Sequence, residues 1–465
     1  MRNIIHYLYK SINGTKKKLD VLRAQQWHDS KQVNALQYNR LTRLIKYAYK
    51  HVPYYRNLLS DSGVVNSQKK IILDNFSNIP LLDKQTIKNE FERLQSDKLH
   101  KRKWHYETTG GSTGEPTKVI HDLERSRWII AMKGLRNEWC GVKLNHKKVH
   151  LWGSERDLFV GKETFKTNLN RWLNNSLWLN AFRMTTEDMY RYVETINRFC
   201  PIYIKGYATC LYEFAQFIRE NKLIIHSPQS IVSCAGTLTH IMRTTIEQVF
   251  QTSIFNNYGS RDVQAMAFEC SEHTGLHVLA PLLYLEIIRD DGSPTEYDEV
   301  GEVIMTPFFN YAMPLIRYRI GDMAYWAKNE CTCGRHWPLL GNVSGRVTEC
   351  FRRKDGGLVP PEYFIHLFGV VLNDGWIKKF QIIQEELNRI RVLIVCSKQH
   401  HNPQGRYNNE LKELTKKIKH VMSENCAVHY DFLDDILPTS SGKYLYTISK
   451  VNGNNSATKA LSRKG

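Results

Sequence analysis

The chain has no apolar run that approaches the roughly 20 residues needed to span a membrane. The segment from Met1 to Asn13 also has no apolar core of the secretory kind, because His6, Tyr7 and Lys10 interrupt its short apolar patches. The ten cysteines do not follow the spacing of a disulfide framework, and the chain has no internal repeat. We therefore expect a cytoplasmic globular protein with reduced thiols, rather than a membrane-embedded, disulfide-rich or repeat protein.

Negative charge is scarce. Lys and Arg number 65 against 46 Asp and Glu, which leaves a formal net charge of +19. The cations are dispersed along the chain, so we predict no nucleic-acid partner; the excess fits an enzyme that handles phosphates, or one that works near the anionic inner surface of a membrane. Two basic runs, at 16–18 and 416–419, suit such peripheral membrane contact, and a solvated basic face without a partner explains them equally well. Nothing in the sequence indicates an oligomeric state.

The apolar pattern predicts an α/β fold with two or more domains, because 465 residues exceed an ordinary single domain. Short apolar segments at 149–153, 202–207, 231–236 and 254–259 read as strands separated by helices, which predicts a largely parallel sheet. We assign them to a large N-terminal α/β domain with mixed sheets, 1–345, whose last part, from about 275, has the short alternating strands of a β-rich subdomain. Residues 346–450 have the pattern of a small α+β domain. Residues 451–465 have the composition of a disordered basic tail.

Three local signals refine this outline. Apolar residues recur at helical spacing from Val33 to Leu59, with a break around Pro53. Asp83 is placed to cap the N-terminus of a helix. An amphipathic helix is predicted from Asn409 to Met422 within the C-terminal domain.

The loop from Thr108 to Lys118 gathers glycine, hydroxyl and cationic residues. Its glycines allow backbone N–H groups to approach an anion, and its hydroxyls and one ammonium add donors, so it is typical of a phosphate-binding loop. It is not the mononucleotide loop G-x-x-x-x-G-K-[ST], because Glu115, Pro116 and Thr117 separate Gly114 from Lys118 and an apolar strand pattern follows. A plain surface turn remains the alternative for this loop taken by itself.

Four later motifs complete the pattern: Tyr258-Gly259-Ser260-Arg261-Asp262, Arg317-Tyr318-Arg319-Ile320-Gly321-Asp322, Ser344-Gly345-Arg346 and Leu437-Pro438-Thr439-Ser440-Ser441-Gly442-Lys443. In this order, with the glycine-rich loop, they resemble the adenylate-forming ligases. The segments 44–55, 79–87, 205–207 and 313–318 are similar to the phenylacetate-CoA ligase-like branch of that superfamily, which includes proteins of capsular polysaccharide biosynthesis. The resemblance covers nearly the whole chain.

The resemblance implies an ATP-dependent enzyme that activates a small carboxylic acid as an acyl-adenylate and then transfers the acyl group. We expect the acceptor to be an amine or hydroxyl of a sugar in surface or capsular polysaccharide biosynthesis, as the capsule-associated relatives imply. The alternative acceptor is CoA, as the phenylacetate-CoA ligases imply. A non-catalytic basic binding protein that keeps the fold is a further alternative. Lys443 and Asp322, both in place, oppose that last alternative.

The resemblance also implies roles for single residues. Lys443 would bridge the attacking carboxylate and the α-phosphate, and Arg346 would act with it as a catalytic residue. Asp322 would accept hydrogen bonds from the ribose, Tyr258 would offer its ring to the adenine, and Asp262 would be the acidic partner of Mg²⁺. The residues assigned to nucleotide binding are Thr108, Thr109, Gly110, Gly111, Ser112, Thr113, Gly114, Lys118, Gly236, Tyr258, Gly259, Ser260, Asp262 and Asp322.

Three positions depart from the family pattern. Asp262 stands where relatives carry Glu, which shortens the reach to magnesium by one methylene and favours binding through water. Gly236 stands where relatives often carry Glu, so a polar contact near the substrates is absent. Glu349 stands where the hinge usually has Asp; a Glu can make the same hydrogen bonds, so we expect the C-terminal domain to rotate between adenylation and transfer.

A possible structural Zn²⁺ site lies in the second half of the chain. Cys331 and Cys333 form a close thiol pair, and Cys270 and His277 lie upstream, which makes a closed set of four zinc-type ligands. His273 is the alternative fourth ligand, and buried reduced thiols beside a surface histidine explain the spacing equally well. Related ligases carry a similar cysteine-rich loop, which favours the metal.

Aromatic residues offer candidates for an acyl pocket. They are Trp152, Trp172, Trp178, Phe182 and Tyr207. Packing in the core is the alternative for each of them.

Overall fold

The fold is taken from a computed structural model of the chain. It describes residues 14–108, 117–143, 146–152, 171–181, 184, 186–234, 236, 238–260, 262–346, 351–354, 358–359, 364, 367–368, 376–396, 408–436 and 447–451. These residues fall into two compact units. The first lies within 1–109, 118–320 and 324–343, and the second within 110–117, 321–323 and 344–465.

The first unit begins with helices that follow the predicted pattern. Helix α3 starts after Asp29, whose side chain accepts from Gln32 N while the Gln32 side chain accepts from Asp29 N, a complete capping box. Pro53 starts α4 at the first helical turn, where a missing N–H costs nothing. Asp83 caps α5 by accepting from Thr86 N, as the sequence predicted. The helical segments before the first strand are α2 (Thr15–Gln25), α3 (Ser30–His51), α4 (Pro53–Asp61), η1 (Leu73–Asn78), α5 (Lys84–Asn89) and η2 (Leu99–Lys101).

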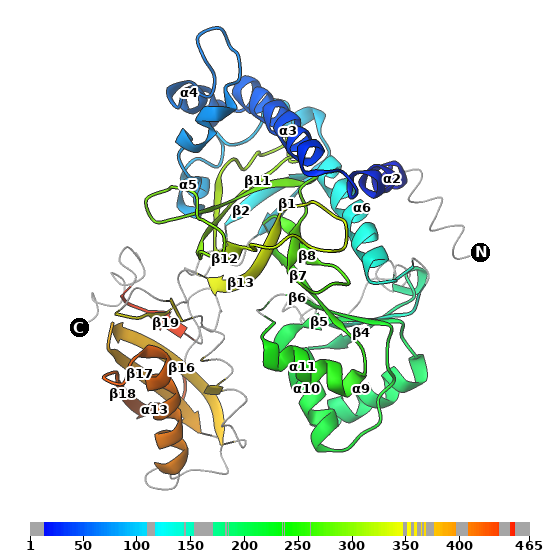
Figure 1. Cartoon of the computed structure of the whole chain (residues 1–465), viewed down its shortest axis with the longest axis vertical. Coiled ribbons are helices and arrows are strands. Elements are labelled where there is room, and N and C mark those ends of the chain that lie inside the picture. The colour runs from blue at the N-terminus through cyan, green and yellow to red at the C-terminus, as the bar shows by residue number, and fades with distance from the viewer. Residues whose placement is uncertain are drawn as a thin grey trace. The chain divides into compact units, whose positions relative to one another are not determined.

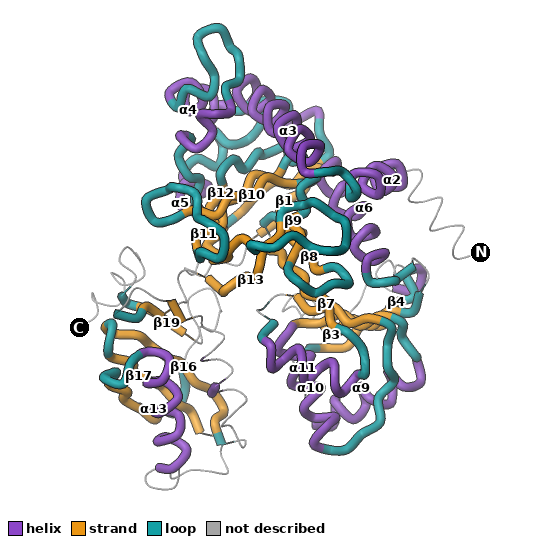
Figure 2. The backbone as a smooth tube through the Cα atoms, in the orientation of Figure 1, coloured by secondary structure: helices purple, strands orange, loops and turns teal. Residues whose placement is uncertain are grey.

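An eleven-stranded mixed sheet is the centre of the first unit (Figures 1 and 2). Its order is β10-β11-β12-β13-β9-β8-β7-β6-β5-β3-β4. Strands β7, β6, β5, β3 and β4 run parallel, and β7, β8, β9 and β13 pair antiparallel, so the predicted parallel sheet continues into antiparallel strands. The strands are β3 (Lys148–Trp152), β4 (Ser176–Asn180), β5 (Tyr203–Tyr207), β6 (Ser230–Cys234), β7 (Ile254–Ser260), β8 (Gln264–Glu269), β9 (Leu276–Val278), β10 (Leu283–Ile288), β11 (Gly301–Pro307), β12 (Tyr318–Trp326) and β13 (Leu339–Arg346).

Helices cover both faces of the parallel strands, the arrangement expected of an α/β fold. Helices α9 (Thr186–Phe199), α10 (Ala208–Glu220) and α11 (His240–Phe250) lie on one side, as Figure 1 shows. Helix α6 (Leu123–Trp139) packs on the other side, where Met132 and Leu135 share a core with Tyr203, Val232 and Phe255. A separate hairpin, β1 (Trp104–Thr108) with β2 (Lys118–Asp122), precedes α6.

The second unit is a small α+β body. Its sheet has the order β18-β17-β16-β19, with a hairpin of β14 and β15 beside it in sequence. Helix α13 buries Leu414, Ile418 and Met422 in the core of this sheet, so the predicted amphipathic helix is present. The elements are β14 (Phe351–Arg352), β15 (Leu358–Val359), β16 (Ile377–Glu386), β17 (Arg389–Cys396), α13 (Asn408–Met422), β18 (Ala427–Phe432) and β19 (Thr447–Ser449).

The predicted fold class, α/β with mixed sheets and a small α+β part, is confirmed. Among the described helices, none combines the length and apolar character that a bilayer crossing requires. Every cysteine within the described residues is a free thiol.

Candidate active site

The turn between β7 and β8 carries one predicted nucleotide motif. The register slips between Tyr258 and Gly259, and a Cβ at Gly259 would lie 2.1 Å from the carbonyl oxygen of Gln264, so only glycine fits. Ser260 Oγ accepts from Val263 N at 3.1 Å and closes the turn. The side chain of Tyr258 is partly buried and packs against the main core of the first unit.

Asp262 is held from three elements. Its Oδ2 accepts a 2.6 Å hydrogen bond from Tyr318 Oη. Its backbone carbonyl accepts from His121 Nε2 of β2 at 3.0 Å and from Arg125 Nη2 of α6 at 3.2 Å. With 5% of its surface exposed, the Asp262 carboxylate is fixed in position, and its Oδ1 has no hydrogen-bond partner among the described residues.

Arg317, the residue before Tyr318, is anchored by several contacts that fix the position of Tyr318. Its guanidinium pairs with Glu286 at 3.1 Å and donates to the carbonyls of Ser77 and Ile79. The Arg317 backbone has a φ of 49°, and its N–H donates to Thr306 Oγ1 at 2.9 Å. Burial raises the pKa of Glu286, and the Arg317 charge opposes that rise. Arg317 therefore fixes the start of β12 rather than binding substrate.

Asp322, the predicted ribose ligand, lies in β12 and is 9% exposed. It follows Gly321, whose φ of 85° is in the left-handed region that glycine adopts without strain.

The glycine-rich loop is described only at its ends. Thr108 is the last residue of β1, and Lys118 is the first of β2. The Lys118 ammonium lies 3.5 Å from the centre of the Tyr106 ring, a cation–π contact. Thr109, Gly110, Gly111, Ser112, Thr113 and Gly114 lie outside the described residues, so their assignment to phosphate binding stays a prediction.

Of the remaining assigned positions, some lie within the described residues and others do not. Gly236 is exposed, and a Cβ there would meet only the Cβ of Ala208 at 3.8 Å, so no steric constraint requires glycine. Arg346 is the last residue of β13, and its side chain is outside the description, as are Glu349 and Lys443. The catalytic roles of Arg346 and Lys443 stay predictions.

Cys270, His277, Cys331 and Cys333 come together in the first unit, with their four ligand atoms within 4.8 Å of one another. Cys270 Sγ lies 3.5 Å from Cys331 Sγ, and Cys333 Sγ lies 3.3 Å from His277 Nε2. The opposite ring nitrogen of His277, Nδ1, donates to the carbonyl of Trp337 at 3.4 Å, which directs the Nε2 lone pair at the thiols. The alternative ligand, His273, instead pairs with Glu269 at 3.1 Å.

The protonation states at this cluster suit a soft metal. Burial lowers the pKa of His277 to about 4, so the ring is neutral at pH 7. Burial acts to raise the pKa of Cys331, but hydrogen bonds from Thr274 and Cys333 outweigh it and lower that pKa. Burial raises the pKa of the Cys270 thiol to about 12, because the thiolate is poorly solvated there. A bound cation would stabilise that thiolate and lower its pKa. Three thiols and one imidazole fit a closed tetrahedral Zn²⁺ site.

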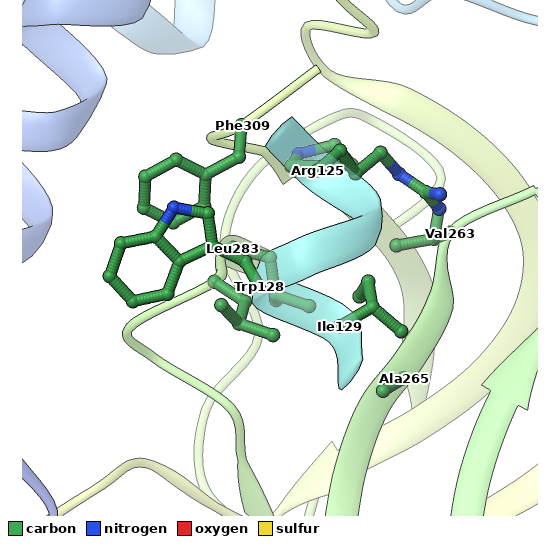
Figure 3. A pocket seen from close by; sticks show the side chains of 9 residues that line it. Arg125, Trp128, Ile129, Val263, Ala265, Leu283 and Phe309 are labelled. Atoms are coloured by element: carbon green, nitrogen blue, oxygen red, sulfur yellow. The ribbon is translucent and has the colours of Figure 1, made fainter. Parts of the chain in front are cut away.

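A small cavity lies between α6 and the sheet (Figure 3). Arg125, Trp128 and Ile129 of α6 line it together with Val263, Ala265 and Phe309. The Trp128 and Phe309 rings are stacked, with centroids 4.4 Å apart. Its volume of about 10 Å³ has room for no more than about one water molecule, so it is not the binding site of an acid.

A second cluster, which was not predicted from the sequence, lies at the β1–β2 hairpin. His105, Glu107 and His121 place their ligand atoms within 4.8 Å of one another, and His121 is fully buried with no partner for its Nδ1. Burial lowers the pKa of His121 to about 3, and the neighbouring Arg125 charge adds to the shift. That cation disfavours a metal here, so we assign His121 to holding Asp262. The alternation of His105, Glu107 and His121 on paired strands was the signal available in the sequence.

Comparison with known proteins agrees with these motifs. Residues 351–450 match the family model described as the CapK C-terminal domain. Protein CapK of Staphylococcus aureus is 26% identical over 422 residues, which is 90% of this chain and 89% of CapK. The phenylacetate-coenzyme A ligase of Thermus thermophilus is 24% identical over 335 residues, or 68% of this chain and 71% of that ligase. These similarities support the predicted resemblance to the adenylate-forming superfamily, in the phenylacetate-CoA ligase-like branch with CapK.

The solved structures extend this result to the fold. A 2-hydroxyisobutyryl-CoA ligase in the postadenylation state, in complex with 2-HIB-AMP, aligns with a TM-score of 0.66 at 16% identity, covering 94% of this chain and 93% of that one. This likeness shows that the chain has the fold of that ligase. The resemblance seen in the sequence is therefore confirmed.

Proposed function

We propose that this adenylate-forming enzyme joins an acyl group to an amine or hydroxyl of a sugar during surface polysaccharide synthesis. The observation that carries the proposal is the similarity to protein CapK, which extends over 90% of the chain and both of its units. The similarity to the Thermus ligase covers 68% of the chain. The family model at 351–450 likewise bears the CapK name.

In the first half-reaction, a carboxylate oxygen attacks the α-phosphorus of ATP, and the bond from that phosphorus to the bridging oxygen breaks. Pyrophosphate leaves, and the acyl-adenylate stays. Lys443 neutralises charge between the attacking carboxylate and the α-phosphate, with Arg346 in support, while Asp322 accepts from the ribose hydroxyls. Tyr258 offers its ring to the adenine, and the loop from Thr108 to Lys118 donates to the outer phosphates.

In the second half-reaction, the sugar amine or hydroxyl attacks the acyl carbon and AMP leaves. The alternative acceptor is the thiol of CoA, which the named phenylacetate-CoA ligases support. A structure of the 2-hydroxyisobutyryl-CoA ligase in complex with 2-HIB-AMP and CoA supports the same alternative.

Two metals belong to the proposal. Magnesium would approach Asp262, whose Oδ1 is a carboxylate oxygen of the type this ion prefers, and would screen the charge of the phosphates. Zinc would be held by Cys270, His277, Cys331 and Cys333, and would stabilise the loop that carries the last two.

We place the enzyme in the cytoplasm, close to the inner membrane surface where lipid-linked sugars are assembled. The free thiols support a reducing compartment. Lys416 is exposed on α13, which suits contact with anionic lipid. Lys16 and Lys18, in contrast, pair with Asp20 and Glu124 at 3.5 and 2.9 Å, so the first basic run is largely engaged within the protein.

The test is a pyrophosphate-release screen over carboxylic acids, followed by transfer assays with nucleotide-linked amino sugars, lipid-linked saccharides and CoA. We expect a sugar to consume the acyl-adenylate faster than CoA does. Saturable thioester formation, with no transfer to any sugar, would instead establish the CoA ligase. Failure of every acid to release pyrophosphate would favour a non-catalytic binding protein.

A further inference from the structure

The sheet face that α6 covers is apolar at Tyr203 and Val232, and it becomes polar and aromatic farther along β3 and β5. On β3 and β5, the side chains that point to this face alternate with buried apolar ones: His150 and Trp152 on β3, and Lys205 and Tyr207 on β5. The register places His150 beside both Trp178 of β4 and Lys205 of β5. A sheet face that carries cations and aromatic rings instead of aliphatic residues is typical of a binding surface.

A cavity of about 190 Å³ opens on this face. The His150 ring stacks on Trp178 with centroids 4.7 Å apart, and the guanidinium of Arg171 lies 5.0 Å from the same indole. This cavity is far larger than the one beside Trp128, which has about 10 Å³, so it has room for one part of a small molecule. Its lining residues are Lys148, His150, Arg171, Asn174, Ser176 and Trp178.

Two further cations lie near His150, one on β5 and one on α6. The Lys205 ammonium lies 5.5 Å from the centre of the Trp152 ring, which stacks on Tyr207 at 4.6 Å. Lys133 of α6 is exposed, and desolvation by the surrounding protein, then the charges of Lys205 and Arg136, lower its pKa to about 8. Neither Lys133 nor Lys205 has a carboxylate at ion-pair distance among the described residues.

The same face leads to the nucleotide motif. Helix α6 crosses it, and its Arg136 donates a hydrogen bond to the side chain of Asn257, the residue before Tyr258. Strand β6 alone separates β5 from β7. Because parallel strands present their carboxyl ends at one edge of the sheet, Tyr207 of β5 and Tyr258 of β7 lie toward the same edge.

Lys205 is half-buried and Lys133 is exposed, and a bound anion stabilises neighbouring cations that have no acidic partner. We propose that the face formed by Lys133, Lys205 and the cavity beside His150 binds a second anionic group of the acyl substrate. The enzyme then activates acids that carry a further carboxylate or phosphate besides the carboxylate that is adenylated. This inference rests on the proposed adenylation, with Trp152 and Tyr207 flanking the carbon skeleton between the two anionic ends.

The test measures affinity, which does not depend on turnover. Matched pairs of acids, glutarate with pentanoate and phthalate with benzoate, are titrated into the wild type and into Lys205→Met by calorimetry. We expect the dianion to bind at least about tenfold more tightly than its monoanion in the wild type, since a charge-assisted contact contributes that much. The ratio should fall toward one in Lys205→Met and stay unchanged in Lys46→Met, which removes an exposed lysine on α3.

Several outcomes would overturn the inference. Equal affinity for both acids of each pair, absence of measurable binding by any dianion, or a preference retained in Lys205→Met would each do so. Loss of CoA binding in Lys205→Met, with the acids unaffected, would assign the face to phosphates of an acceptor instead. Lys133→Met repeats the test if Lys205→Met does not fold. A wild type with the expected ratio but without pyrophosphate release would refute the adenylation and leave the anion site standing.

Discussion

Tyr318 donates a 2.6 Å hydrogen bond from its phenol to Oδ2 of Asp262, inside the first unit. Tyr318 is fully buried and Asp262 is 5% exposed, so water cannot replace this bond. Asp262, which we propose faces magnesium, is therefore positioned by Tyr318, a residue of a different sequence motif.

Tyr318→Phe removes that donor and leaves a buried carboxylate oxygen without a partner. We expect a loss of about 1–3 kcal/mol in the free energy of unfolding and a raised KM for MgATP in pyrophosphate release. Tyr297→Phe, at a side chain that is 66% exposed, is the control and should change neither quantity. An unchanged KM for MgATP in a destabilised Tyr318→Phe protein would limit Tyr318 to a structural role.

Purified protein should contain roughly one zinc per chain, measured by elemental analysis, because four ligands of the right type converge. Chelation should lower the melting temperature. Chelation should also change the tryptophan fluorescence. Arg335 follows the Cys333 ligand closely in the chain, and its guanidinium carbon lies 4.7 Å from the centre of the Trp27 ring and 4.3 Å from that of Trp139.

Cys333→Ser should lose the zinc, and Cys200→Ser, at an exposed thiol, should keep it. Zinc-free wild-type protein whose melting temperature does not respond to chelator would retire the metal site.

Acid should destabilise the protein partly through His121. Its pKa in the folded protein is lowered to about 3 by burial, whereas the unfolded chain takes up the proton near pH 6.5. The unfolded state thus binds more protons between these values, so stability falls as the pH drops below about 6.5, by about 2 kcal/mol from this one group at pH 5. Unfolding measured from pH 7.5 to 5 should show a shallower fall in His121→Asn than in the wild type. Parallel pH profiles for the two proteins would contradict this assignment.

Lys443→Ala should abolish acyl-adenylate formation while ATP still binds, because an ammonium between the two reacting anions acts mainly in the transition state. Pyrophosphate release and ATP affinity are measured on the same preparation. Lys416→Ala, on the exposed side of α13, is the control for loss of one lysine in the C-terminal unit. Wild-type pyrophosphate release by Lys443→Ala would show that another group screens the α-phosphate.

The sequence by itself determined the strand positions, the resemblance to the adenylate-forming ligases and the zinc-type ligand set. Strands β3, β5, β6 and β7 fall where short apolar segments predicted them, because each of these strands buries at least two apolar side chains. The ordered motifs carried the resemblance, because their residues meet local requirements of the backbone. At Gly259 a Cβ would clash with the backbone, and Gly321 has a positive φ. The choice of His277 over His273 agrees with the structure, where His273 pairs with Glu269.

Only the tertiary structure decided which side chains meet. Tyr318 and Asp262 belong to separate motifs, and nothing local to either shows that they share a hydrogen bond. Likewise, Lys205 reads as one more lysine in a basic chain until the register sets it beside His150 and α6 brings Lys133 to the same face. Contacts between distant segments depend on strand order, register and helix packing, which sequence spacing does not encode, so the cationic face became visible only in the folded chain.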